Sequence, residues 1–260
     1  SLAATAQATA DQAILDAAAA QAAADAAQAD ADAAQTTADT ASAAAAQANT
    51  VLANIANDDL LTPGEKPEVI LKRDVIVNEQ AGITAEATSY GITTEKTAYT
   101  DAVTALTDYL ATLTTPVLWN SLAGNTTIVG TTFRTKFADV YAARQALLNK
   151  IAAVAKSIAD TAQAAADDAQ ATADQAIVDA ATAQAAADAA QADADTAQAT
   201  ADTATAAAVQ ANTVLANIAN DDLLTPGEKP EVILKRDVIV NEQAGITAEA
   251  TSYGITTEKT

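Results

Sequence analysis

The chain has 260 residues, enough for one or two globular domains, but its composition does not supply a large core. Hydrophobic residues make up 50%, yet most of them are alanine, and bulky anchors are limited to two Phe, five Tyr and one Trp. The 34 acidic and 13 basic residues give a net charge of −21, which disfavours nucleic acid and membrane surfaces as partners. Histidine, cysteine and methionine are absent, which excludes Cys/His zinc sites, thiol nucleophiles and Ser-His-Asp triads.

No stretch approaches 18 consecutive apolar residues, so we expect no membrane insertion. An N-terminal signal peptide is also not expected, because no basic region is followed by an apolar one. We expect no catalytic, cofactor-binding or metal site and no cofactor, and the chain is not expected to be an enzyme.

The strongest feature of the sequence is an internal duplication. Residues 1–97 match residues 164–260 at 87 of 97 positions, and Gln47–Thr97 recurs unchanged as Gln210–Thr260. The chain starts without methionine, and the second copy stops inside an expected helix. We therefore expect a fragment of a longer tandem array, in which length itself is useful.

Alanine recurs in a strict heptad pattern in both copies. Spacings of three and four alternate, which places alanine at the a and d positions of a predicted coiled coil, while Asp and Gln keep columns b and e. The register extends back to Ala152, so a continuous helix is expected from near Thr132 to about Asn220, on the order of 130 Å long. Column a runs from Ala3 to Leu52 and column d from Ala6 to Ile55; in the second copy they start at Ala166 and Ala169.

Alanine at a and d leaves the arrangement of the helices open. Small side chains let helix axes approach closely but bury little area, so bulkier segments are needed to hold the rods in register. The pattern is compatible with dimers, trimers and antiparallel helix pairs. An exposed low-complexity helix is the alternative interpretation.

Residues 58–150 contain nearly all the large apolar side chains and predict a three-helix module. Thr62 and Glu65 form a capping-box pattern with a proline at the first helical position, which predicts a helix over 65–89. Pro67 has no N–H to donate, so a kinked or delayed first turn is expected. The expected apolar face consists of Val69, Ile70, Val75, Ile76 and Ile83.

Gly91 is placed to end this helix in a left-handed cap. Thr93 or Thr94 then caps a second predicted helix that ends near Leu113. Apolar residues recur along it at steps of three and four, namely Tyr99, Val103, Leu106, Tyr109, Leu110 and Leu113.

The loop over 114–131 is apolar enough that we expect it to be held against the helices. It contains Val117, Leu118, Trp119, Leu122, Ile128 and Val129. Thr131 or Thr132 is expected to cap the third helix, which continues into the second alanine rod. Its apolar residues are Phe133, Phe137, Val140, Tyr141, Leu147 and Leu148.

The predicted fold class is all-α and fibrous, with long alanine-rich coiled-coil rods alternating with small helical bundles. The predicted segments are a coiled coil over 1–57, the three-helix module over 58–150, a coiled coil over 151–220 and the start of a second module over 221–260. Aromatic residues are expected to form the module core, with a ligand-binding patch as the alternative. Asp58 and Asp59 could ligate a cation, but an acidic pair before a helix is more often solvated or favoured by the helix dipole.

Five motifs in the module form a recognisable set. They are Asp59–Lys66, Glu79–Ile83, Tyr90–Ile92, Ile128–Arg134 and Tyr141–Leu148. Together they resemble helical modules in tail-tip and host-specificity proteins, the central tail fibres of long-tailed bacteriophages. The resemblance covers most of residues 58–150, and the alanine heptads are too generic to add to it.

The resemblance implies a structural shaft segment of a virion fibre that spaces and orients the parts for host adsorption. It implies a homotrimer, other tail proteins as partners, contact with the host surface only through parts outside this chain, and an extracellular location in the phage tail. It carries over no catalytic residue. The residues also leave open a bacterial surface adhesin or stalk, and an ice- or surface-binding helical protein. An acid-pair glycosidase is the remaining enzyme class, and no acid pair has a spacing that favours it.

Overall fold

The computed structural model describes residues 2–55, 57–218, 223–252 and 254. This part of the chain is all-α, as predicted, with five α-helices and one sheet of two very short strands. The chain divides into two compact units. The first unit consists of residues 6–178, and the second of residues 1–5 and 179–260.

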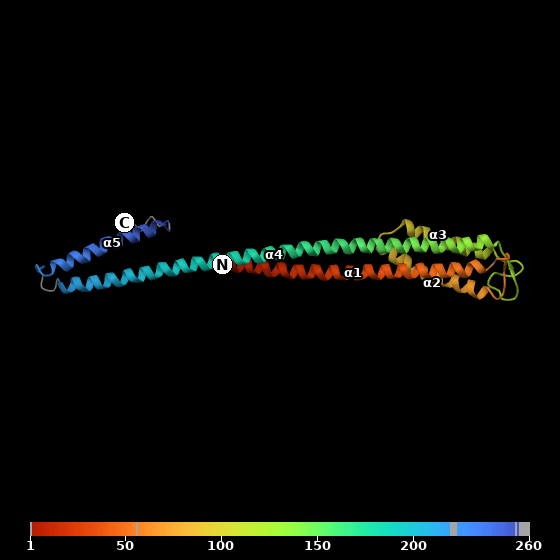
Figure 1. Ribbon diagram of the computed structural model, residues 1–260, viewed down its shortest axis with the longest axis horizontal. Coiled ribbons are helices and arrows are strands. Elements are labelled where there is room, and N and C mark those ends of the chain that lie inside the picture. The colour runs from red at the N-terminus through yellow and green to blue at the C-terminus, as the bar shows by residue number, and fades with distance from the viewer. Residues whose placement is uncertain (1, 56, 219–222, 253, 255–260) are drawn as a thin grey trace. The chain divides into compact units, whose positions relative to one another are not determined.

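The first unit is built around an antiparallel helix pair. α1 (Leu2–Asn54) lies beside the first part of α4 (Gly130–Ile218), and the two helices run in opposite directions (Figure 1). Gln145 Nε2 donates a hydrogen bond to the Ala38 carbonyl oxygen at 3.1 Å, and this contact places the two residues opposite each other. Each step forward along α1 is therefore a step back along α4.

The burial of α1 follows the predicted heptads. All a positions from Ala3 to Leu52 and all d positions from Ala6 to Ile55 are buried or half-buried, and every other residue of α1 is exposed. On α4 the facing alanines Ala152 and Ala159 are buried too. The heptad prediction is confirmed, and of the arrangements compatible with it, the first unit has the antiparallel pair, formed within one chain.

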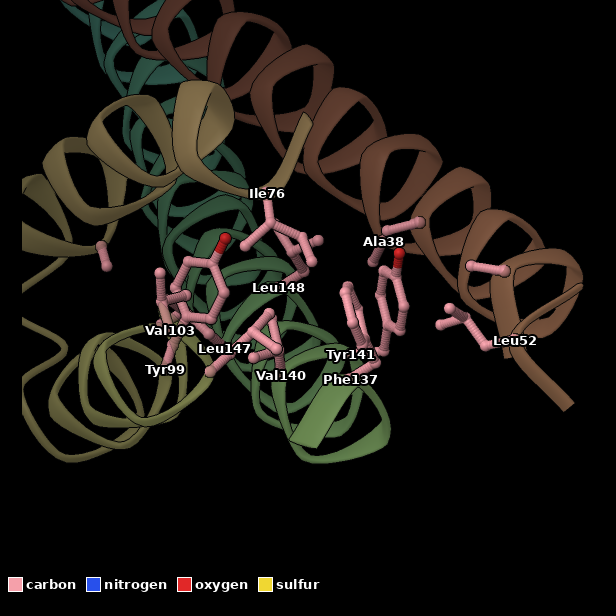
Figure 2. Close-up of a cluster of buried hydrophobic side chains, with 14 of the residues drawn as sticks. Ala38, Leu52, Ile76, Tyr99, Val103, Phe137, Val140, Tyr141, Leu147 and Leu148 are labelled. Carbon is pink, nitrogen blue, oxygen red and sulfur yellow. The ribbon is translucent and has the colours of Figure 1, made fainter. Parts of the chain in front are cut away.

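Two further helices complete the module of the first unit. α2 (Lys66–Ser89) and α3 (Thr94–Thr112) pack against each other, and their buried residues join those of α1 and the start of α4 in one hydrophobic cluster. β1 (Leu60–Leu61) pairs antiparallel with β2 (Thr126–Thr127) beside the cluster. The core therefore lies where the rod meets the module (Figure 2).

α2 starts later than a simple capping box predicts. The Glu65 carboxylate oxygen Oε2 accepts hydrogen bonds from the Thr62 amide at 2.9 Å and the Thr62 hydroxyl at 2.7 Å, so it reaches back as expected. Residues 63–65 form a turn, and the helix begins at Lys66. Pro67 then lies in the first turn, where a missing N–H leaves no hydrogen bond unmade. The expected delay of the first turn is confirmed.

The end of α2 agrees with the prediction in detail. Gly91 has a φ of 68°, the left-handed region that glycine adopts without strain. The Ile92 amide donates to the Ala87 carbonyl at 2.8 Å and the Gly91 amide to the Thr88 carbonyl at 3.0 Å. These two hydrogen bonds are those of a Schellman motif.

Two details of the prediction were wrong. α4 begins at Gly130, so Thr131 and Thr132 lie inside its first turn and not at its cap. Val75 is 50% exposed, because it adjoins the fully buried Ile76 and neighbouring positions on a helix point about 100° apart. The loop over 114–131 is held against the helices as expected, because Trp119 and Ile128 are buried, although three of its apolar residues, Leu118, Leu122 and Val129, are exposed.

The second unit contains the remainder of α4 and α5 (Lys229–Ser252), which repeats the sequence of α2 without a change. α4 is helical to Ile218, close to the expected end of the rod near Asn220. Residues 219–222, with that end and the first residues of the expected second module, lie outside the described residues, as do residues 255–260.

Candidate functional site

The candidate site, the junction, is a set of polar contacts that joins the elements of the module. It comprises Asp59, Lys66, Glu79, Arg144 and the loop over 118–124. Within the described part of the chain, no three or more His, Cys, Asp or Glu side chains are grouped so that they could hold a metal ion. The contacts of the junction join α2, α4 and the loop after α3.

Lys66 is the centre of the junction. Its side chain is 0% exposed, and its ammonium group donates to the carbonyl oxygens of Leu118, Ser121 and Gly124 at 3.2, 2.6 and 2.7 Å. Burial lowers the pKa of Lys66 from its usual value. The three acceptors match the three ammonium hydrogens, so one side chain fixes the course of the loop after α3.

Asp59 connects the start of the module with the start of α4. Its Oδ1 accepts the Gly130 amide at 2.8 Å, and its carbonyl oxygen accepts the Ile128 amide at 3.0 Å. A carboxylate at a helix N-terminus satisfies a free amide and is stabilised by the helix dipole. Asp58 Oδ1 accepts the Leu60 amide at 3.2 Å. Asp59 therefore has the role at a helix N-terminus that was expected for this acidic pair as the alternative to cation binding.

Glu79 of α2 and Arg144 of α4 form an ion pair inside the module. The Arg144 Nη2 and Glu79 Oε2 atoms are 2.6 Å apart, and the side chains are 15% and 21% exposed. Burial raises the pKa of the Glu79 carboxyl, and the positive charge of Arg144 acts in the opposite direction. Removal of either partner would leave a charge in a poorly solvated place, so the pair needs both residues.

Two tyrosines lie next to this ion pair. Burial, followed by the negative charge of Glu79, raises the pKa of Tyr99, and the same causes raise the pKa of Tyr141 to about 12. Both phenols are therefore neutral at physiological pH. The Tyr99 side chain is fully buried and Tyr141 nearly so.

The aromatic residues form the module core, as predicted. Five of the seven described aromatic residues are buried, namely Tyr99, Trp119, Phe133, Phe137 and Tyr141. Phe133 and Phe137 contact each other with ring centroids 5.2 Å apart. The Arg73 guanidinium lies 5.2 Å from the ring centroid of Trp119, which ties the loop to α2 by a cation–π contact.

The outer surface of the alanine rods is covered by regular Gln–Asp pairs. In most of them, a Gln at position e donates to an Asp four residues later at position b, as for Gln21 and Asp25 at 2.9 Å. The same pair occurs in the second copy between Gln184 and Asp188 at 2.7 Å. Such i, i+4 pairs stabilise a helix modestly, which explains why these residue types keep their own columns.

The sequence alone does not predict the roles of Lys66, Glu79 and Arg144. Their partners lie 52 to 65 residues away along the chain, beyond the reach of any local pattern. All three belong to the motifs that carry the resemblance to phage proteins, and this was the only sequence feature that singled them out.

Comparison with known proteins gives one informative relationship. The chain is 32% identical over 211 residues to a tail fiber protein of Enterococcus phage phiEF24C. The alignment covers 81% of this chain but 10% of that protein, so the chain spans about a tenth of the length of the curated relative it matches. No family model and no solved structure matches the chain. The similarity agrees, at the level of a broad class, with the phage tail proteins that the module resembles.

In the described residues, no helix is both long and apolar enough to cross a membrane. The exposed faces of the rods carry the acidic Gln–Asp pairs instead.

Proposed function

We propose that this chain is a structural shaft segment of a bacteriophage tail fibre, where it spaces and orients the parts that adsorb to the host. The similarity to a tail fiber protein over 81% of the chain carries the proposal. The near-identical copies and the 89-residue helix α4 support it, because both serve a molecule in which length is useful. The role is mechanical and not catalytic, and the location is the virion tail.

The junction has a clear part in such a role. Layers of alanine bury little apolar area, so the antiparallel pair of α1 and α4 gains limited stability from its own contacts. The module joins the two helices at one end through Asp59, Lys66 and the Glu79–Arg144 pair. In the proposed shaft, the junction keeps the two rods in register under load.

Homotrimeric assembly is a further part of the proposal and rests on the resemblance of the module. Because α4 covers the a and d positions of α1 in the first unit, the proposed trimer contacts lie outside this seam. Analytical ultracentrifugation of the purified chain is expected to give three times the mass of 26.1 kDa. A monomeric mass at all concentrations would remove the trimer and leave the shaft role untouched.

The location can be tested by immunogold electron microscopy. Antibodies against the chain are expected to label the tail of the phage that encodes it, with particles of an unrelated phage as control. Label on a bacterial envelope, with unlabelled virions, would replace the proposal with a surface adhesin or stalk.

A further inference from the structure

The two copies of the repeat are near-identical in sequence but have different surroundings. α5 repeats α2 residue for residue, yet Ile76 of α2 is 0% exposed whereas Ile239 of α5 is 50% exposed. Lys66 is fully buried and its copy Lys229 is exposed. Since the sequences are identical, the difference comes from what covers each helix.

The alanine seam shows the same difference independently. Ala31 and Ala38 of α1 are buried, at 5% and 0% exposure. Their copies on α4, Ala194 and Ala201, are exposed. In the first unit the seam of α1 is covered by the stretch of α4 that follows the module. The copied seam is thus a second apolar face without its cover.

These two faces border one groove in the second unit. A cavity of about 680 Å³ opens between α4 and α5. Its apolar lining includes Ala204, Ala208, Ala211, Val238, Ile239 and Ile246. In the first unit, Phe137 and Tyr141 of α4 lie between Ala38 and Leu52 of α1 and Ile76 of α2 (Figure 2). The side chains that fill this space in the first unit therefore come from the start of α4.

The charges at the groove also point to a segment like the start of α4. Glu242, the copy of Glu79, lines the cavity, and the one cation in its lining, Lys235, lies 3.9 Å from the Glu231 carboxylate. In the first unit Glu79 pairs with Arg144, which lies on α4 between Tyr141 and Leu147. A carboxylate in the lining of a groove favours an arginine at one position of the segment that docks there.

We infer that the groove of the second unit is a docking site for a segment with the sequence of residues 94–178, supplied by a following copy of the repeat. This segment holds every group that covers α1 and α2 in the first unit: α3, the loop that binds Lys66, Arg144 and the seam of α4. A second molecule of this chain is the poorer occupant, because its own segment 94–178 already packs against its own α1 and α2. The inference is independent of the phage role.

The test compares the present chain with an extended one, in which residues 98–178 follow directly after residue 260. The chain has no cysteine, so the variant I239C reports on the groove through the rate at which its single thiol reacts with a thiol reagent. We expect this thiol to react about tenfold more slowly, or slower still, in the extended chain, because docking buries it. The matched variant I76C should be protected in both chains, since Ile76 is already covered.

A second measurement avoids any change in the groove. In the extended chain with W119F, the single remaining tryptophan is the one in the added segment, and its emission maximum is expected to match that of Trp119 in the present chain. Equal reactivity of the I239C thiol in both chains, with solvent-like tryptophan emission, would overturn the inference. Protection of the I239C thiol in the present chain that grows with protein concentration would also overturn it, by identifying a second molecule as the occupant.

Discussion

Lys66 and Lys229 occupy the same position in the two copies of the repeat, but their different surroundings give them different contributions to stability. The buried Lys66 ammonium group serves three carbonyl oxygens, and a hydrogen bond from a charged donor is among the stronger ones in proteins. Its copy Lys229 is exposed to solvent. The chain thereby offers its own control for the value of a buried charge.

We expect K66M to lower the free energy of unfolding of the first unit by about 2 to 4 kcal/mol, because the carbonyls of residues 118, 121 and 124 lose their donor. Urea unfolding followed by Trp119 fluorescence measures the loss, since Trp119 lies in the same loop. The matched change K229M should alter the stability by less than about 0.5 kcal/mol. Equal effects of the two changes would show that the buried contact does not stabilise the loop.

Tyr141 predicts how the stability depends on alkaline pH. Its pKa is raised from 10.0 to about 12, chiefly by burial. The unfolded chain releases the phenol proton first, so the free energy of unfolding falls as the pH rises from about 10 to about 12 and is retained below that window. Urea titrations at a series of pH values should show a shallower fall for Y141F than for the unchanged chain. Parallel curves through this window would contradict the assignment.

The sequence predicts single residues well where the pattern is periodic and poorly where the contact is distant. The columns from Ala3 and Ala6 were predicted to be buried because a helix repeats its faces every seven residues. The cap of α4 was not, because Asp59 lies 71 residues before Gly130 and the local threonines offered a plausible alternative. Polar contacts between residues far apart in the chain cannot be predicted from a local sequence pattern.

At the scale of elements, the alanine seam between α1 and α4 depends on small side chains. Ala38 is 0% exposed and its carbonyl accepts the hydrogen bond from Gln145, so the helices approach closely there. A larger residue at this position must push the helices apart or adopt a strained rotamer. The copied position Ala201 is exposed and has room.

We therefore expect A38L to destabilise the first unit by about 1 to 3 kcal/mol, and A201L to change the stability of the present chain very little. Chemical unfolding followed by circular dichroism and by Trp119 fluorescence distinguishes the two variants. If A38L were neutral or stabilising, the antiparallel pair would have to be looser than the burial of Ala38 indicates.

The helices themselves were predictable, but their pairing was not. Their caps and periods lie in local sequence, as the Schellman motif at Gly91 shows. The helix that pairs with α1, and its orientation, could not be predicted, because alanine fills both a and d. No larger residue there favours a parallel or an antiparallel partner. The strands β1 and β2 were missed because two residues each are too few to show an alternating pattern.

At the scale of the whole molecule, the two units differ in how much of their apolar surface is covered. The first unit has a continuous core that includes every module helix. The second leaves six large apolar residues of α5 exposed, namely Ile233, Leu234, Val238, Ile239, Val240 and Ile246. Burial of apolar area is the main stabilising term, so the second unit should be the less stable of the two.

We expect urea to unfold the chain in two steps. Far-ultraviolet circular dichroism should lose part of its helical signal while Trp119 fluorescence stays native, and both signals should change in a second step at higher urea. Two steps are measurable because the only tryptophan lies in the first unit. Coincidence of the two signals in one transition would mean that the units unfold together.

The first unit is slightly longer than the repeat from which it is built. It runs from residue 6 to residue 178, so it contains residues 6–15 and also their copies, residues 169–178. Residues 169–178, which copy the start of α1, thus belong to the first unit. Insertion or deletion of one whole period of 163 residues restores the same neighbours around every position, whereas any other change cuts through a unit. An array of this kind can therefore evolve in length only by fixed steps, and variants of the full protein should differ by whole repeats.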